Sequence, residues 1–355
     1  MRKGVQRRAG RLALALACVA VASGAMASQA PAKRLYWGAW IGSQLTGTEP
    51  PYDMRAVSRF EHIVGKKLSL LEWSIPFADC SHSPCSYFGF PQTEMSKVRH
   101  HGAIPFLSWG SSGLGFNPPA IQPPFQLRDV TRGHFDGYIR GFARAAKRWG
   151  HPFFLRFNWE TNGDWFPWGI HTNGNRPRQF VPAWRHVRRI FRRVGARNAT
   201  WVWCPYVDPQ HKDSLRALYP GGRYVDWTCL DGYNWAHSAA NPHPWQSFGQ
   251  LFRSSYRRVL KFAPHKPMVL GEVASSDFGG NKARWIRRML RQVPRRYHRV
   301  RGLVYFDVND RGTHWPLETS RRVIRAFRHG IARHAYAPGR FRHIRARPIR
   351  PPGHR

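Results

Sequence analysis

The sequence predicts an α/β protein in which eight parallel strands, each followed by a helix, close into a (β/α)8 TIM barrel. Short apolar runs rich in β-branched and aromatic residues alternate with longer segments of helical periodicity, the pattern of parallel strands joined by crossover helices. Eight such runs occur, and the chain is long enough for one barrel of roughly 250 residues or more. No sequence repeat of about 20 to 50 residues is present, which disfavours a solenoid or a propeller.

The eight strand candidates are, in chain order, Leu35–Ile41, Leu68–Trp73, Ala103–Ser108, Phe153–Phe157, Thr200–Cys204, Trp227–Leu230, Pro267–Leu270 and Gly302–Phe306. Helical periodicity predicts helices over residues 54–65, 92–100, 135–149, 180–194, 214–219, 246–262, 282–292 and 320–334. The helix over 135–149 is the clearest, because its apolar side chains share one stripe and Gly150 provides a C-cap. An open doubly wound sheet is the alternative fold, but no glycine-rich dinucleotide motif follows the first strand.

The two ends of the chain differ from the predicted barrel domain of residues 28–335. Residues 1–27 combine five cations with an uncharged run and an Ala-Met-Ala motif, which predicts a signal peptide cleaved after Ala27, with Ala30 as the second choice. We therefore expect a secreted, extracellular protein whose mature chain has no transmembrane segment. Residues 336–355 are rich in Arg and Pro without apolar periodicity, which predicts a disordered basic tail.

Four cysteines follow the predicted signal peptide, and an even count in an exported protein predicts two disulfides. Cys204 closes the fifth predicted strand and Cys229 lies in the sixth, so neighbouring barrel strands could bring them within bonding distance. We expect Cys204–Cys229 and Cys80–Cys85, with free buried thiols as the alternative. No Cys-x-x-Cys motif for a zinc site occurs, and we expect neither a metal nor a cofactor.

The formal charge of the chain is +38, a value that is typical of nucleic-acid-binding proteins. Most of the arginines, however, fall where barrel helices would face water, the pattern of solvated helix faces. No carboxylate cluster that would hold the divalent metals of a nuclease is evident. We expect the basic surface and tail to adhere to an anionic cell-surface polymer, with no specific nucleic acid as partner.

Active sites of such barrels lie at the carboxyl ends of the strands, and of the seven glutamates of the chain Glu160 and Glu272 stand out there. Hydrolysis of a glycosidic bond with retention needs two carboxyl groups about 5–5.5 Å apart, one protonated and one ionised. Glu160 follows the fourth predicted strand, and apolar neighbours such as Trp159 would raise its pKa, which suits an acid/base. Glu272 ends the seventh predicted strand, and Arg156 and Tyr233 would keep it charged as the nucleophile.

Aromatic and amide residues gather at the same predicted strand ends and in the loops after them. Sugar rings present C–H faces that pack on aromatic planes and hydroxyls that need polar partners. The predicted sugar contacts are Arg156, Asn158, Trp159, Trp165, Trp168, Tyr233, Trp109, Trp315 and Glu72, and Trp40 and Trp235 share their placement. Core packing is the alternative for each tryptophan and a structural salt bridge is the alternative for Glu72, while Asp231 is interpreted as structural.

The chain resembles glycoside hydrolase family 26 over most of residues 35–325. The resemblance rests on four segments: Arg156–Gly169, Asp231–Trp235, Gly271–Glu272 and Val304–Phe306. It implies that Glu160 matches the acid/base, Glu272 the nucleophile and Tyr233 the tyrosine that orients the nucleophile. The family usually carries a histidine directly before the acid/base, where this sequence has Trp159, so one contact to a sugar hydroxyl is absent or supplied by Asn158.

By this resemblance the first expectation is a secreted retaining endo-β-glycosidase that hydrolyses β-1,4-mannan. A β-glucanase or a xylanase of the same fold is the second expectation. A non-catalytic carbohydrate-binding cell-surface protein is a third, indicated by Trp159 and opposed by the presence of both carboxylates.

Overall fold

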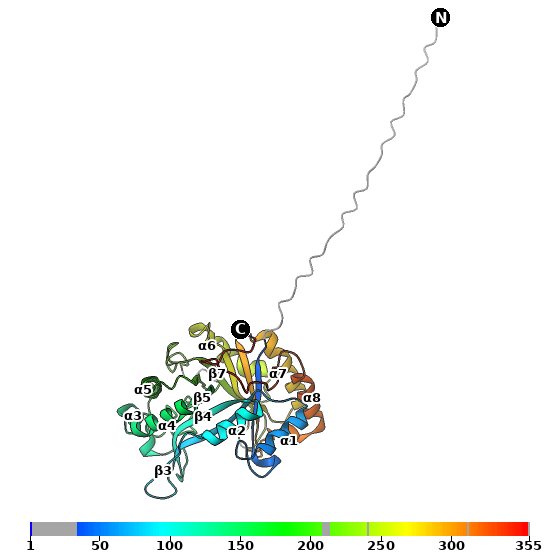
Figure 1. The fold of residues 1–355 in the computed structure, drawn as a ribbon. Helices are drawn as coiled ribbons and strands as arrows, with labels where there is room; N and C mark the ends of the chain where they lie inside the picture. The colour runs from blue at the N-terminus through cyan, green and yellow to red at the C-terminus, as the bar shows by residue number, and fades with distance from the viewer. Residues whose placement is uncertain (2–33, 208–213, 240, 311, 354–355) are drawn as a thin grey trace. The chain divides into compact units, whose positions relative to one another are not determined.

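Eight parallel strands close into a barrel in the computed structural model, which describes Met1 and residues 34–207, 214–239, 241–310 and 312–353 (Figure 1). The barrel strands are β1 (Tyr36–Ile41), β2 (Leu70–Asp79), β4 (Ile104–Leu114), β5 (Phe153–Phe157), β6 (Ala199–Trp203), β7 (Trp227–Asn234), β8 (Met268–Ser275) and β9 (Val300–Asp307). Each strand pairs in parallel with the next, and β1 pairs with both β2 and β9. The predicted (β/α)8 fold is therefore confirmed.

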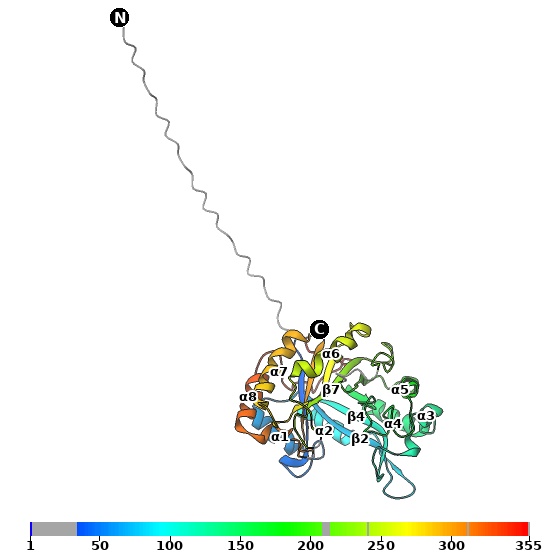
Figure 2. The same cartoon turned by 180° about the vertical axis from the view of Figure 1, so that it is seen from behind.

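Helices surround the barrel, and α1 and α8 lie side by side in both views of the fold (Figures 1 and 2). The helices are α1 (Met54–Val64), α2 (Gln92–His101), α3 (Leu127–Arg132), α4 (Asp136–Trp149), α5 (Pro177–Val194), α6 (Phe248–Phe262), α7 (Lys282–Arg296) and α8 (Arg321–Ile331), with 3-10 turns at Ser43–Leu45, Pro123–Phe125 and Leu317–Thr319. The predicted helix at 214–219 is wrong: these residues form turns, because so short a segment gains too few hydrogen bonds to offset nucleation. In the part of the chain that the structure describes, no helix is long and apolar enough to cross a membrane.

Two strands extend past the barrel and carry an extra hairpin. The strand β3 (Ser86–Tyr87) pairs antiparallel with the end of β2, and the Cys80–Cys85 disulfide closes the loop between them. A second disulfide, Cys204–Cys229, joins the end of β6 to β7 with 4.3 Å between the Cα atoms. Both predicted cysteine pairs are thus joined in the structure.

The carboxyl-terminal segment is ordered, so the prediction of a disordered tail at 336–355 is wrong for the described residues 336–353. Ile349 is buried beneath the barrel, where its N–H donates to Thr200 Oγ1 and its carbonyl accepts from Trp227 Nε1. Thr200 and Trp227 begin β6 and β7, so this segment covers the amino ends of the strands. The segment forms neither helix nor strand, so its sequence carries no apolar periodicity that would predict its burial.

The predicted signal peptide lies outside the described residues, except for Met1.

Candidate active site

The carboxyl end of β5 places Glu160 through an unusual backbone turn. Asn158 and Glu160 have left-handed φ angles of 44° and 49°, a conformation that costs a non-glycine residue roughly 1–2 kcal/mol. Their N–H groups donate to the carbonyls of Trp109 (3.1 Å) and Cys204 (2.7 Å), which hold the turn against the neighbouring strand ends. Because the turn breaks the alternation of a regular strand, the consecutive residues Trp159 and Glu160 both line the same cavity.

Glu160 is buried in an environment that favours its protonated form. Its Oε2 accepts a 2.7 Å hydrogen bond from Trp165 Nε1, while its Oε1 has no partner among the described residues. Burial, followed by the nearby charge of Glu272, raises the pKa of Glu160 to about 8. A carboxyl group in this state holds its proton at neutral pH and can donate it to a leaving oxygen.

A bulge in β8 aims Glu272 at the same cavity. The register between β7 and β8 shifts at Gly271, so that Asp231 pairs with Glu272. A Cβ atom at Gly271 would lie 2.6 Å from both Asp231 Oδ1 and Cys229 Sγ, so a side chain has no room there. Glycine therefore permits the bulge, and the bulge re-aims the glutamate that follows it.

The two oxygens of Glu272 have separate donors. The Arg156 guanidinium donates to Oε1 and the Tyr233 hydroxyl donates to Oε2. One carboxylate oxygen of Glu160 and one of Glu272 lie within 4.8 Å of each other. Such a close approach suits a retaining pair, whose carboxyl groups lie about 5–5.5 Å apart.

Arg156 is fully buried at the centre of a network of carboxylates. Besides Glu272 it contacts Glu72 (2.8 Å) and Asp231 (2.6 Å), and its Nε donates to Ser108 Oγ, which in turn donates to Glu72 Oε1. Burial raises the pKa of Glu72 and of Asp231 well above the usual range, although the charge of Arg156 acts in the opposite direction. These carboxylates raise the pKa of Arg156 in spite of its burial, so the guanidinium supplies a fixed positive charge beside Glu272.

Oxygens of Glu160, Asp231 and Glu272 are close enough together to hold a metal ion. The guanidinium of Arg156 already contacts Asp231 and Glu272, however, and provides positive charge at this place. A second group of potential ligands contains Cys204 and Cys229, whose sulfurs are joined to each other. That no metal or cofactor is needed stays a prediction.

The cavity above the two glutamates has a volume of about 1070 Å³ and largely aromatic walls. The aromatic residues that line it are Trp40, Trp159, Trp165, Phe166, Tyr206, Tyr233, Trp235, Phe306 and Trp315, and polar side chains such as Asn162, His171, His243 and Gln246 lie between them. Trp165 is 44% exposed at the rim, where a sugar ring could stack on it. Flat apolar faces with interspersed polar groups suit an oligosaccharide chain.

Four of the nine predicted sugar contacts line this cavity: Trp159, Trp165, Tyr233 and Trp315. The other five lie behind its wall: Arg156, Asn158, Trp168, Trp109 and Glu72. Of these five, Arg156 acts on the site through its bonds to Glu272 and its neighbours.

The remaining four are wrong as sugar contacts, because packing or hydrogen bonds satisfy them elsewhere. Glu72 is fully buried and bonded to Ser108 and Arg156, so the alternative of a structural salt bridge holds. Trp109 is fully buried and stacks on Phe142 of α4, with 4.2 Å between the ring centroids. Neither side chain lines the cavity.

Asn158 and Trp168 instead support the loop that carries Glu160. The amide of Asn158 accepts from the Ser111 N–H and donates to Ser111 Oγ, both at 2.8 Å. Trp168 stacks on Phe166 and donates from Nε1 to the carbonyl of Trp159. Asn158 therefore does not replace the sugar contact that the family's histidine would provide.

Tyr206 and Lys282 are among the site residues for which the sequence predicted no role. Tyr206 lies two residues after the cysteine that follows β6, and its hydroxyl accepts a 3.0 Å hydrogen bond from Trp235 Nε1; its position after a strand was a usable signal. Lys282 donates to the carbonyls of Trp315 (3.0 Å) and Pro316 (2.7 Å) and so holds the loop that carries Trp315. No sequence signal links Lys282 to that loop, since more than thirty residues separate them.

The barrel and its pair of close, differently held glutamates define a protein of the glycoside hydrolase class. The model of glycosyl hydrolase family 26 matches residues 136–263. Endoglucanase H of Acetivibrio thermocellus is 31% identical over 300 residues, which are 83% of this chain and 30% of that protein. Together these similarities show that the chain belongs to glycoside hydrolase family 26.

A further curated relative and a solved structure are also similar to this chain. The mannan endo-1,4-beta-mannosidase A and B of Caldalkalibacillus mannanilyticus is 29% identical over 125 residues, or 33% of this chain and 21% of that protein. The catalytic domain of an endo-beta-1,4-mannanase from Bacillus sp. JAMB-750 has the same fold, with a TM-score of 0.65 and 17% identity over 87% of this chain and 88% of that one. The chain spans less than a third of the length of the two curated relatives described here.

Proposed function

We propose that this chain is a secreted endo-β-glycosidase that acts with retention of configuration by double displacement. The observation that supports this best is the approach of Glu160 and Glu272 within 4.8 Å in two different environments. Glu160 holds its proton at neutral pH, and its Oε1 has no hydrogen-bond partner among the described residues. Glu272 accepts hydrogen bonds from a guanidinium and a hydroxyl. One carboxyl can thus act as the acid/base and the other as the nucleophile.

In the first displacement, a carboxylate oxygen of Glu272 bonds to the anomeric carbon while the glycosidic C–O bond breaks. The proton of Glu160 passes to the leaving oxygen, and Tyr233 and Arg156 keep the carboxylate of Glu272 in line. In the second, Glu160 takes a proton from a water whose oxygen attacks the anomeric carbon. The bond to Glu272 breaks, and the sugar leaves with its original configuration after one water is consumed.

The alternative is a carbohydrate-binding protein that has lost turnover, and Trp159 in place of the family's histidine is the observation that favours it. A simple assay separates the two. Purified protein is incubated with mannan, mixed-linkage β-glucan and xylan, and new reducing ends are measured. We expect release from at least one of them, with Glu272→Gln as the inactive control. Binding to a glycan without any release would support the non-catalytic alternative.

The activity should have an alkaline limit set by Glu160. Because Glu160 must carry a proton to assist the leaving group, kcat/KM should fall as pH rises through about 8. The hydrogen bond from Trp165 stabilises the charged form of Glu160, so Trp165→Phe should move this fall to higher pH. The measurement is the pH profile of kcat/KM for both proteins, and an alkaline limb that does not move would contradict the role given to this hydrogen bond.

For the substrate, we propose β-1,4-mannan first and β-glucan second. The names of the relatives include both a mannosidase and an endoglucanase. Trp159 lines the cavity beside Glu160 and presents a large ring with one N–H donor and no acceptor, where the family usually has a histidine. A sugar hydroxyl that lost its partner there would cost roughly 1–3 kcal/mol, or about tenfold and more in kcat/KM.

A Trp159→His variant tests which sugar faces this residue. If the wild type prefers β-glucan or xylan, the histidine should shift the ratio of kcat/KM values toward mannan by about tenfold. Trp159→Phe is the matched control, because it also shortens the ring that packs on Phe166 and over Arg156 but adds no polar group. Equal ratios in all three proteins would show that residue 159 does not select the sugar.

We also propose that the protein is exported and adheres to an anionic cell-surface polymer. The composition of residues 1–27 and the two disulfides support export. The net charge of +38 supports the anionic partner. Sequencing the amino terminus of the exported protein tests the first part, with Ser28 as the expected first residue.

A further inference from the structure

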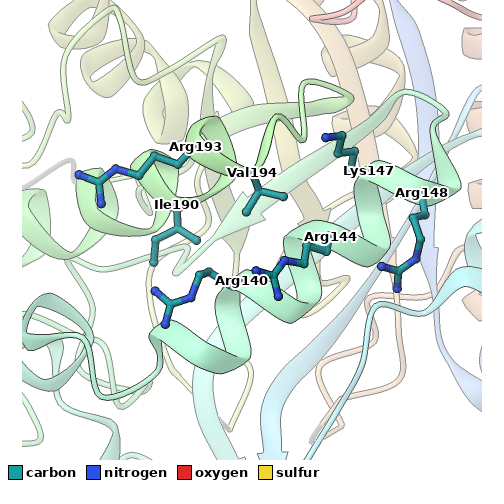
Figure 3. Close-up of a pocket in the computed structure, with 7 residues that line it drawn as sticks. All are labelled: Arg140, Arg144, Lys147, Arg148, Ile190, Arg193 and Val194. Atoms are coloured by element: carbon teal, nitrogen blue, oxygen red, sulfur yellow. The ribbon is translucent and has the colours of Figure 1, made fainter.

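A groove of about 590 Å³ lies between α4 and α5 on the outside of the barrel (Figure 3). Five cations line it, four from α4 and one from α5, above two aliphatic side chains of α5. The cations are Arg140, Arg144, Lys147, Arg148 and Arg193, and the aliphatic residues are Ile190 and Val194. The cations on α4 repeat every three or four residues, so they share one face of the helix. None of these residues lines the cavity above Glu160.

The positive charge of the groove is mostly uncompensated. Of the residues that line the groove, Arg140 forms an ion pair with Asp136 (3.3 Å). Asp136 also contacts His186 (2.6 Å), so its charge is shared between two partners. Arg144, Lys147 and Arg193 are exposed and form no ion pair with any residue that the structure describes. A groove with unpaired cations on its walls attracts an anion more strongly than a convex helix face with the same charge.

Further cations lie beyond the carboxyl end of α4. Arg347 of the carboxyl-terminal segment donates to the carbonyl of Gly150, the residue that ends α4. Burial, followed by the charges of Arg99 and Arg347, lowers the pKa of the adjacent His151. Several cations therefore lie close together between the end of α4 and the amino ends of the barrel strands. One polymer chain could contact these cations as well as those of the groove.

We propose that the groove between α4 and α5 binds an acidic polysaccharide, with the polymer's carboxylates on the cations and its sugar faces on the aliphatic floor. Guanidinium groups pair well with carboxylates, and a C–H face of a sugar can lie on the partly buried Val194, whereas Ile190 is only 3% exposed. Among the residues that the structure describes, no aromatic ring lines the groove, which disfavours a single-stranded nucleic acid because its bases would have nothing to stack on. The inference deepens the proposed adhesion to an anionic polymer and does not depend on hydrolysis.

Such a site would hold the enzyme on a cell surface that contains both an acidic polymer and the neutral glycan that the enzyme cleaves. Tethering raises the local concentration of substrate at the active site without a new contact to that substrate. The acidic polymer is therefore a binding partner and not the substrate.

The test compares two triple variants that each remove three exposed positive charges. The groove variant is Arg144→Gln, Lys147→Gln and Arg193→Gln, and the control variant is Arg257→Gln, Arg287→Gln and Arg325→Gln on α6, α7 and α8. The Kd for polygalacturonate is measured at low and at moderate salt. We expect about a tenfold weaker Kd and a smaller salt dependence for the groove variant, but less than about a twofold change for the control.

Hydrolysis of a neutral oligosaccharide should stay at the wild-type rate in both variants. This readout separates the inference from the proposed function, because a protein without turnover could still show the difference in binding. The proposal would be overturned if both variants weakened the binding of polygalacturonate equally. It would also be overturned if the wild-type protein bound the fully methyl-esterified polymer as tightly as the acid form. Tighter groove-dependent binding of single-stranded DNA than of polygalacturonate would replace it with a nucleic-acid site.

Discussion

A Glu272→Ala variant should lose at least about 10⁴-fold in kcat/KM, because no covalent glycosyl-enzyme can form without the carboxylate. Arg156 keeps its contacts with Glu72 and Asp231 in this variant, so we expect the fold to persist. Thermal unfolding of the variant checks that point, and Glu272→Gln provides a second variant of nearly the same shape. Retention of more than about a hundredth of the wild-type activity would show that Glu272 is not the nucleophile.

Azide should restore turnover to Glu272→Ala with a diagnostic product. The anion can enter the space left by the carboxylate and attack the anomeric carbon from the same side, which displaces the leaving group in one step. The product is a glycosyl azide of inverted configuration. A glycosyl azide of retained configuration would contradict the assignment.

A Glu160→Ala variant should lose about 10²- to 10⁴-fold on natural glycans, because the leaving oxygen then departs without a proton. Aryl glycosides with good leaving groups need little protonation, so their first displacement should proceed nearly as fast as in the wild type. Burst kinetics with such a substrate measure this step directly. Equal losses on good and poor leaving groups would contradict the role of Glu160 as the acid.

The same reagent gives the opposite product in this second variant. With Glu160 removed, Glu272 still forms the glycosyl-enzyme, and azide then attacks from the side where Glu160 stood. The resulting glycosyl azide has the retained configuration. The two alanine variants are therefore matched controls for each other, and they distinguish the nucleophile from the acid/base by product stereochemistry alone.

The fold was predictable from the sequence because its signals are local. Each strand is a short apolar run, and each long helix shows an apolar stripe and an identifiable end, such as Gly150 after α4. The carboxyl-terminal segment was not predictable in the same way. Ile349 is buried through contacts with Thr200 and Trp227, which are distant in the chain and leave no periodic pattern.

The two glutamates were predictable because the barrel fixes where strand ends meet. The side chains around them were harder to assign, since small backbone irregularities decide which way each one points. The left-handed residues Asn158 and Glu160 bring Trp159 into the cavity beside Glu160, and a regular strand would have separated them. Trp109 was predicted to follow a strand end, but it lies within β4 and turns outward to stack on Phe142, and only the packing of α4 reveals this.

The configuration of the first product tests the central claim most directly. If Glu160 and Glu272 act as acid/base and nucleophile at their separation of within 4.8 Å, hydrolysis must proceed with retention. Proton NMR during hydrolysis of a β-linked oligosaccharide resolves the anomeric signals before mutarotation mixes them. We predict that the β-anomer of the new reducing end appears first and the α-anomer grows in later. Initial appearance of the α-anomer would show inversion and would contradict the double displacement proposed for this pair.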